Sequence, residues 1–271
     1  MSSASSFHNA HSNTYERMAS RCTLTVAEKI ISSITPPITA ESYVLDNASG
    51  TGVVTGCIRA VQPKARIVAA DLAPAVLEIL NQKGFDDVQT EVLDVRDLKT
   101  LKDETFSHVI TNFGMAQDPK DTGGPARAAR EIWRVLKPGG VAAVTTWRGR
   151  NFTTAFEQTS LRIRPDSEPF SWGADPAWET DYFLMNALAQ AGFGEKVSVR
   201  EIQSAAEAPS LDELVDNMLL FKDMFFKDYN EEEKSMLPSI LKDELRKLDK
   251  FSEKEGRAAV EMTAWMGMAW K

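Results

Sequence analysis

The feature that most constrains the fold is the stretch from Tyr43 to Gly52, where a short apolar run passes directly into a glycine-rich loop. The apolar run ends at Asp46, and apolar residues then recur at helical spacing after the loop: Val53, Val54, Cys57, Ile58 and Val61. The pattern predicts a strand, a tight turn and a helix. Such a unit places a carboxylate, bare glycine backbone and the positive end of a helix dipole at one point. A ligand can lie there.

The loop fits two kinds of ligand. Gly50, Gly52 and Gly56 form G-x-G-x-x-x-G, which is one residue longer than the usual dinucleotide fingerprint. The order Asp46-x-Ala48-x-Gly50-Thr51-Gly52 instead resembles the first motif of class I S-adenosylmethionine (SAM) methyltransferases, D-x-G-x-G-T-G. The resemblance implies a loop beneath the amino-acid part of SAM, whose ammonium a nearby carboxylate can hold. Ala48 replaces the family's first glycine, and we expect its methyl group to be tolerated at negative φ.

Acidic residues follow the next two predicted strands. The strand from Arg66 to Ala70 ends at Asp71-Leu72, and an acid at this position of nucleoside-binding folds accepts hydrogen bonds from ribose hydroxyls. The strand Val88–Val92 precedes Asp94 and Val95. The family resemblance implies that this acid reaches the adenine amine and that the next N–H meets a ring nitrogen. Asp97 is the competing acid, and its alternative role is to cap a short helix that follows.

A fourth strand, Phe106–Thr111, leads into Asn112-Phe113-Gly-Met115. In the family this segment lies beside the methyl donor and opens toward the acceptor. The resemblance therefore implies that Asn112 and Phe113 contact the cofactor and that Met115 contacts the acceptor. His108 lies in the middle of this strand, where side chains face neighbouring elements, and we interpret it as structural.

The late part of this half carries a second signature. A helix from Gly124 to Leu136 is stopped by Lys-Pro-Gly-Gly, and the strand Val141–Thr146 follows, ending at Trp147. The run Arg-Val-Leu-Lys-Pro-Gly-Gly strongly resembles the family's late signature. Leu-Asp-Asn-Ala-Ser-Gly-Thr-Gly and the Thr-Trp pair are similar to fungal secondary-metabolite methyltransferases, a branch related to the ubiquinone/menaquinone-biosynthesis methyltransferases.

The resulting fold class is α/β. We expect a Rossmann-like, seven-stranded, mostly parallel sheet with helices on both faces, its last two strands near 196–202 and 260–268. Residues 1–40 are predicted to form an N-terminal helical cap around a helix at 14–33. Residues 41–271 are predicted to form the SAM-binding domain, with a helical lid inserted at about 208–256. The lid consists of a helix opened by the capping box Ser-Leu-Asp-Glu at 210–213 and ending near 226, and a second at 231–250.

The acceptor and the chemistry are less defined. Acceptor contacts are expected from an apolar set, for which ordinary packing is the alternative: Met115, Trp147, Phe152, Trp172 and Met218. No catalytic residue is assigned. His11 and Tyr15 are candidates if the N-terminal segment folds over the site, and Tyr15 is also expected to cover the methionine part of SAM. The sequence shows no metal-ligand cluster and no G-x-S-x-G, so we expect no metal.

The composition and charge of the chain limit the binding partners and the cellular location that we expect. The 271-residue chain has a net charge of −8 and a pI near 5.1, which argues against a nucleic-acid partner. Apolar runs are too short for a membrane span, the N-terminus lacks a signal-peptide pattern, and two cysteines indicate a reducing compartment. We expect a cytoplasmic protein; its oligomeric state stays open.

The predicted function is SAM-dependent methylation of a small-molecule acceptor, a secondary metabolite, with S-adenosylhomocysteine (SAH) as the second product. Whether O, N, S or C is methylated stays open. One alternative is a SAM-binding subunit without catalysis. The other is a nicotinamide-dependent oxidoreductase, which lacks a Tyr-x-x-x-Lys pair and leaves Asp46 unexplained.

Overall fold

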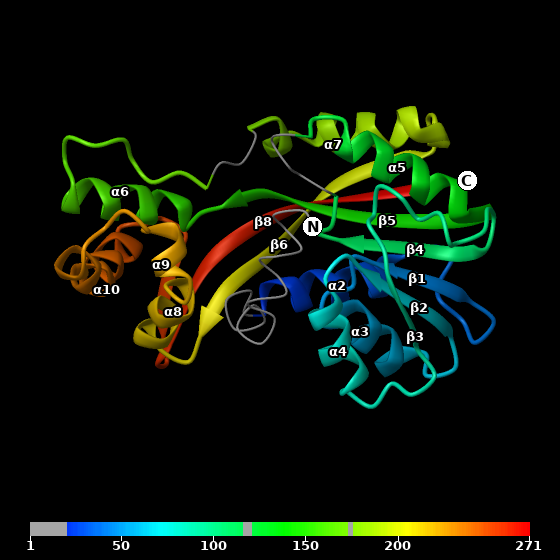
Figure 1. Cartoon of the computed structure of the whole chain (residues 1–271), viewed down its shortest axis with the longest axis horizontal. Helices are drawn as coiled ribbons and strands as arrows, with labels where there is room; N and C mark the ends of the chain where they lie inside the picture. The colour runs from blue at the N-terminus through cyan, green and yellow to red at the C-terminus, as the bar shows by residue number, and fades with distance from the viewer. Residues whose placement is uncertain (1–20, 116–120, 173–175) are drawn as a thin grey trace.

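The computed structural model describes residues 21–115, 121–172 and 176–271. They form one sheet in the order β3-β2-β1-β4-β5-β8-β6, and β7 also pairs with β8 (Figure 1). The strands are β1 Tyr43–Asn47, β2 Arg66–Asp71, β3 Gln89–Val92, β4 Phe106–Asn112, β5 Leu136–Arg150, β6 Val197–Ala208, β7 Phe251–Lys254 and β8 Arg257–Trp270. β1 to β5 pair in parallel, whereas β8 runs antiparallel to β5 and β6. The predicted Rossmann-like, mostly parallel sheet is confirmed, with β7 as an additional strand.

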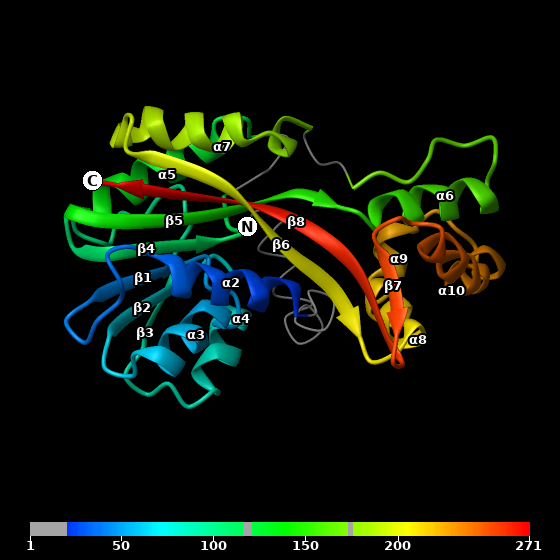
Figure 2. The same cartoon turned by 180° about the vertical axis from the view of Figure 1, so that it is seen from behind.

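Helices cover both faces of this sheet (Figures 1 and 2). One face packs against α2 Cys22–Ser33 and α3 Val53–Val61, and the opposite face against α5 Gly124–Val135 and α7 Asp181–Leu188. Helix α4 Pro74–Asn81 lies along β2 and β3. Alternate strand residues serve the two sides: Val44 and Ile110 enter one core, Leu45 and Val109 the other. This alternation explains why the central strands are apolar throughout.

Three strands continue past the rest of the sheet and carry a second region. β5, β6 and β8, with 15, 12 and 14 residues, extend beyond the parallel strands and hold the remaining helices (Figure 2). These helices are α6 Thr153–Ile163, α8 Leu211–Met218, α9 Lys222–Phe225 and α10 Glu231–Arg246. We call these helices, with β7 and the strand ends they pack on, the helical lobe. The lobe has an apolar core of its own, to which α6, α8, α10 and β8 contribute.

Local capping explains where the lobe helices begin. The Ser210 hydroxyl accepts a hydrogen bond from the Glu213 N–H (3.1 Å) at the start of α8. At α10, Asn230 and Glu233 form a full reciprocal capping box. The single helix predicted from 210 to 226 is wrong, because α8 ends at Met218 and only the short α9 follows.

Three other features of the structure differ from what the sequence predicts. The sixth strand continues to Ala208 because it pairs with β8 along its whole length. The pair Asp175-Pro176 is typical of a helix start, and the sequence predicts one helix from there to Gly192. The structure instead has the 3₁₀ turn η1 Pro176–Glu179, α7 and the π-helical turn η2 Ala189–Phe193. No helix follows Asp97, so its predicted capping role is not observed.

Among the described residues, no helix combines the length and the apolar character needed to cross a membrane.

Candidate functional site

The loop after β1 has an unusual backbone. Ala48, Gly50 and Gly52 have φ values of +58°, +54° and +89°, so three residues of a five-residue stretch are left-handed. Glycine adopts this region freely, whereas an L-residue such as alanine is penalised by about 1–2 kcal/mol. The expectation of negative φ at Ala48 is therefore wrong. The chain must reverse directly after β1, and the surrounding turn imposes this conformation whichever residue stands there.

Gly114 explains how Ala48 is accommodated. A Cβ placed on Gly114 would overlap the Cβ of Ala48 and lie 3.1 Å from Cγ2 of Thr111. The Ala48 methyl group thus occupies space that the glycine after β4 leaves free, and the two loops lie in direct contact. Sequence reasoning missed this role of Gly114; the available signal was an alanine in the first loop together with a glycine in the second.

Asp46 is a buried carboxylate at the carboxyl end of β1, with 1% of its surface exposed. Its Oδ2 accepts hydrogen bonds from the Thr55 N–H (2.9 Å) and hydroxyl (2.7 Å). Its Oδ1 is buried and has no partner among the described residues. Burial raises the pKa of Asp46 to about 7, against the hydrogen bonds from Thr55 that lower it. A cation beside Oδ1 would satisfy this oxygen and favour the charged form.

Asp71 connects the loop to the next helix. Its Oδ2 accepts from the Gly50 N–H and its Oδ1 from the Ala73 N–H, both at 2.9 Å. Each carboxylate oxygen keeps a further lone pair for a ligand hydroxyl. A Cβ on Gly50 would meet nothing within 4 Å, so the space next to this loop is open. Leu72, the adjacent candidate, is half-buried.

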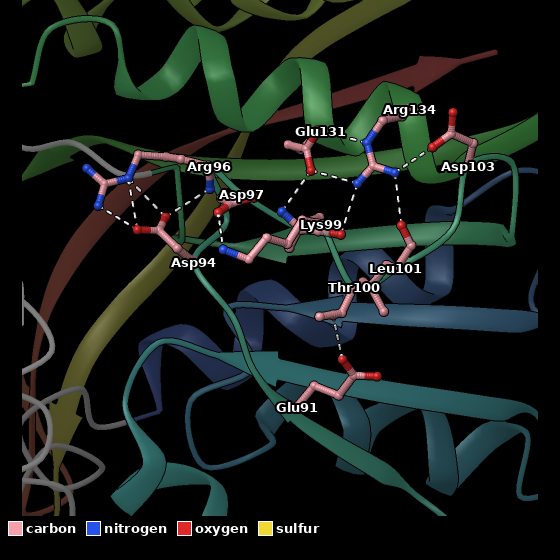
Figure 3. Close-up of polar contacts among 11 residues, drawn as sticks. Glu91, Asp94, Arg96, Asp97, Lys99, Thr100, Leu101, Asp103, Glu131 and Arg134 are labelled. Atoms are coloured by element: carbon pink, nitrogen blue, oxygen red, sulfur yellow. Dashed lines mark hydrogen bonds and ion pairs between the residues drawn. The ribbon is translucent and has the colours of Figure 1, made fainter.

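Asp94 takes part in an ion-pair network at the end of β3 (Figure 3). Nε and Nη2 of Arg96 donate to its carboxylate at 2.9 and 2.6 Å, and Nη1 of Arg96 donates to Asp121 at 2.7 Å. Burial opposes the charged form of Asp94, but these contacts outweigh it and lower its pKa. The competing Asp97 is exposed and pairs with Lys99 (3.1 Å). Val95 is buried in the sheet core.

A second network in Figure 3 assigns a structural role to the late sequence signature. Arg134 donates to Glu131 and Asp103 and to the carbonyls of Leu98 and Leu101. Glu131 also accepts from the Leu98 N–H (2.7 Å). Helix α5 thereby holds the connection between β3 and β4, and with it the loop that carries Asp94.

At the end of β4, Asn112 and Phe113 are both fixed from β5. The Thr145 hydroxyl donates to Asn112 Oδ1 (2.7 Å) and accepts from the Phe113 N–H (3.0 Å). Phe113 has φ +61°, and its ring stacks on Trp147 with centroids 4.0 Å apart. His108, earlier in β4, contacts the Pro36 carbonyl (3.0 Å), and burial lowers its pKa, consistent with a structural role.

A cavity of about 1370 Å³ lies where β5 leaves the sheet for the helical lobe. Its described lining includes five aromatic residues: Trp147, Phe170, Trp172, Trp178 and Phe183. The structure thus brings two predicted acceptor residues, Trp147 and Trp172, to one cavity. The other three are not in its lining.

Those three pack elsewhere. Met115 is buried in the sheet core, Met218 is buried in the lobe core, and Phe152 packs edge-on against Trp172 with centroids 5.8 Å apart. The N-terminal candidates His11 and Tyr15 lie outside the described residues. In the described ranges, no group of three or more His, Cys, Asp or Glu side chains is placed to hold a metal ion.

Comparison with known proteins agrees with this geometry. Residues 44–140 match the family model of a methyltransferase domain. The chain is 25% identical over 260 residues to methyltransferase ucsB from Acremonium sp, covering 88% of this chain and 86% of the relative. The sheet order, the loop after β1 and these matches identify a methyltransferase domain in residues 44–140. The chain is a SAM-dependent methyltransferase.

Two solved structures share its fold. The cyclase SpnF superposes with a TM-score of 0.60 at 13% identity and covers 98% of this chain and 94% of its own. Phosphoethanolamine N-methyltransferase 2 from Haemonchus contortus, in complex with phosphomonomethylethanolamine and SAH, gives a TM-score of 0.55 at 13% identity, with coverages of 98% and 58%. At these identities the likeness shows the fold alone.

Proposed function

We propose that the protein transfers the methyl group of SAM to a small-molecule acceptor of secondary metabolism. The observation that carries the proposal is the unpartnered buried Oδ1 of Asp46 beside a loop that leaves open space at Gly50. A buried acceptor oxygen without a partner requires a donor, and the SAM ammonium supplies one with a positive charge. The residue types present therefore fit the cofactor.

The remaining cofactor contacts follow from the strand ends. We assign the ribose hydroxyls to Asp71, with Leu72 beside it, and the adenine to Asp94 and Val95. Asn112 and Phe113 are assigned to the methyl-donor side of the site. Asp71 keeps free lone pairs for this task, and Asp94 is held in place by Arg96.

We assign the acceptor to the cavity bounded by Trp147 and Trp172. Aromatic walls bind flat apolar surfaces, and indole adds a single polar donor. Trp147 lines this cavity and also stacks on Phe113, so it connects the acceptor side with the cofactor side. The secondary-metabolite assignment is supported by the likeness to fungal methyltransferases such as ucsB.

SAM supplies an already activated methyl group on a sulfonium sulfur. The acceptor nucleophile forms a bond to the methyl carbon, while the sulfur–methyl bond breaks and its electron pair stays on sulfur. The protein's task is to hold the two reactants in line and to exclude water, and such positioning supplies about 7–11 kcal/mol. A thiolate, a neutral amine or an acidic phenol needs no strong base, so no described residue is assigned as one.

The cap and lid are part of the proposal. Helix α2 contacts both the parallel half and β6: the Thr23 carbonyl accepts from Asn112 (3.2 Å), and the Cys22 carbonyl accepts from Ser204 (2.8 Å). We infer that the segment predicted as a helix at 14–33 closes over the acceptor; α8, from the other predicted lid helix, is buried in the lobe core and does not line the acceptor cavity. Deletion of residues 1–20 then lowers turnover while the sheet stays folded; full turnover of the folded truncated protein contradicts this. Cysteine usage supports a cytoplasmic location, because neither Cys22 nor Cys57 is in a disulfide.

Calorimetry with SAM, SAH and NADH tests the cofactor, and a panel of phenols, thiols and amines tests the reaction. We expect micromolar-class binding of SAM and SAH only, and a methylated product from at least one acceptor class. Asp71→Ala should weaken SAM binding about 10- to 100-fold, because it removes charge-assisted hydrogen bonds. Asp97→Ala, an exposed acid, is the matched control. NADH binding without SAM binding, or SAM binding without any product, contradicts the proposal.

A further inference from the structure

Thr145 on β5 contacts Asn112 and Phe113, the two residues that we assign to the methyl-donor side of the site. It lies in the middle of β5, opposite Asn112 in the strand register, and its side chain is fully buried. Its hydroxyl donates to Asn112 and accepts from the Phe113 N–H. One hydroxyl group therefore holds the last residue of β4, Asn112, and the residue that follows it, Phe113.

The chemistry of these contacts requires a hydroxyl. A hydroxyl group carries one hydrogen and two lone pairs, so it can donate to an amide oxygen and accept from an N–H at once. The contact also orients the Asn112 amide, with Oδ1 toward Thr145 and Nδ2 toward the Thr23 carbonyl on α2. Valine has the same shape as threonine but can make neither hydrogen bond.

The backbone conformation of Phe113 explains why this segment needs the hydrogen bonds of Thr145. It is a non-glycine residue at φ +61°, a conformation that costs an L-residue free energy and persists only where neighbours impose it. Thr145 and Trp147 are two residues apart on one strand and point to the same face of the sheet. The same strand thus fixes the Phe113 backbone through Thr145 and stacks on its ring through Trp147, with the two rings 12° from parallel.

We propose that Thr145 is a positioning residue for methyl transfer: its hydroxyl aligns the Asn112–Phe113 segment with Trp147. The inference rests on the proposed function, which places that segment at the methyl donor and Trp147 at the acceptor. Thr145 thereby fixes the position of the Asn112–Phe113 segment relative to Trp147, which lines the acceptor cavity. A displacement of about 1 Å at such a contact lowers the rate about 100-fold.

The test compares Thr145→Val with Thr145→Ser and Thr146→Val. Thr146 is the next residue on β5, is also buried, and its hydroxyl has no partner among the described residues, so its valine variant is a matched control. We expect Thr145→Val to weaken SAM binding about 10-fold and to lower kcat about 10- to 100-fold, with the acceptor KM changed less than about 3-fold. Thr145→Ser should restore both within about 3-fold, and Thr146→Val should match the wild type.

A spectroscopic readout separates positioning from general stability. The tryptophan fluorescence change on SAM binding, assigned by its loss in Trp147→Phe, should be altered in Thr145→Val and kept in Thr145→Ser. Should Thr145→Val fail to fold, Thr145→Ala provides the same comparison. A folded valine or alanine variant with wild-type affinity, kcat and fluorescence change overturns the inference but not the proposed function. Absence of SAM binding by the wild type overturns the proposed function itself.

Discussion

The parallel half of the sheet and the helical lobe are built from different interactions. Around the ends of β1, β2 and β4, the side chains that we assign to the cofactor are held by directed hydrogen bonds: Asp46 by Thr55, Asp71 by two backbone N–H groups, Asn112 by Thr145. In the lobe, aromatic rings meet aromatic rings, as in the Phe156–Phe226 stack and the edge-on contact of Phe170 with Trp172. The first region depends on hydrogen bonds with fixed directions, and the second depends on the fit between apolar side chains.

An exposed charged contact of the lobe fits the same distinction. Arg246 on α10 lies 3.4 Å from Glu253 on β7, and both side chains are exposed. An exposed ion pair contributes about 0–1 kcal/mol, so this contact adds little to the stability of the lobe. A region held by apolar packing tolerates substitutions that preserve its volume, whereas directed hydrogen bonds depend on distance and angle. We therefore expect substitutions in the two regions to affect different measurements.

Gly50→Val is expected to have the largest effect. A Cβ at Gly50 meets no protein atom within 4 Å, so the variant carries backbone strain from the positive φ but no steric clash, and its branched side chain enters the space assigned to SAM. SAM binding should fall at least about 100-fold by calorimetry, since the backbone approach is blocked. Gly139→Val is the matched control, because Gly139 also has positive φ and open space but lies at the start of β5, at the other end of the sheet. Equal loss of binding in both variants would attribute the effect to backbone strain.

Phe156→Ala tests the lobe. The side chain is buried in the lobe core and contacts four other aromatic rings. Truncation should lower the free energy of unfolding by about 3–5 kcal/mol, through lost burial and the cavity left behind. SAM affinity should change less than about 2-fold if the two regions are separable. Met224→Ala, at an exposed lobe position, should leave both quantities unchanged. A large loss of SAM affinity in Phe156→Ala would break the comparison.

The same difference explains what the sequence predicted well. In the parallel half, short apolar runs are bounded by acids and glycines, so β1, β2 and β4 were placed within a residue or two of their observed ends. Because carboxyl ends of parallel strands meet at one edge, the positions of Asp46, Asp71, Asp94 and Asn112 followed from strand order. These are local patterns, and local patterns can be recognised in a single sequence.

Tertiary pairing accounts for what the sequence could not show. The end of β6, Gln203 to Ala208, is alanine-rich and carries no strand pattern, yet it pairs with β8 as far as Ala258. The positive φ of Ala48 and the space beside Gly114 depend on two loops far apart in the chain. The partners of Thr145 likewise come from β4, and a single threonine in a strand gives no signal of them.

The titration of Asp46 gives a smaller, pH-dependent effect. Its pKa in the folded protein is raised to about 7, so the native state holds a proton that the unfolded chain releases near pH 4. This stabilisation is complete below about pH 4 and is lost as the pH rises through 7. SAM binding has the opposite dependence, because its ammonium favours the charged carboxylate.

Between pH 5.5 and 7.5, SAM affinity should therefore rise with pH, by up to about 10-fold per pH unit on the acid side. Asp46→Asn should flatten this profile, since its amide still accepts from Thr55 but does not titrate. Calorimetry in two buffers of different ionisation enthalpy should show proton release on binding. An affinity independent of pH in the wild type would remove Asp46 from the ammonium site.

The smallest effect is expected at Ala48. Glycine removes the left-handed penalty of about 1–2 kcal/mol but adds about 0.5–1 kcal/mol of unfolded-state entropy and deletes a methyl group that fills the space at Gly114. Ala48→Gly should therefore change the free energy of unfolding by less than about 1 kcal/mol, measured by urea denaturation.

The contact between Ala48 and Gly114 allows a double-mutant test of this expectation. Gly114→Ala alone should destabilise strongly, because its methyl group would overlap that of Ala48 and press on Thr111. In the double variant Ala48→Gly/Gly114→Ala, the overlap is removed and only the Thr111 contact remains, so stability should be partly regained. The double-mutant cycle should give a coupling of at least about 1 kcal/mol, as for residues in direct contact. Additive effects would show that the two loops relax independently, and the cofactor region would then be less rigidly interlocked than its hydrogen bonds indicate.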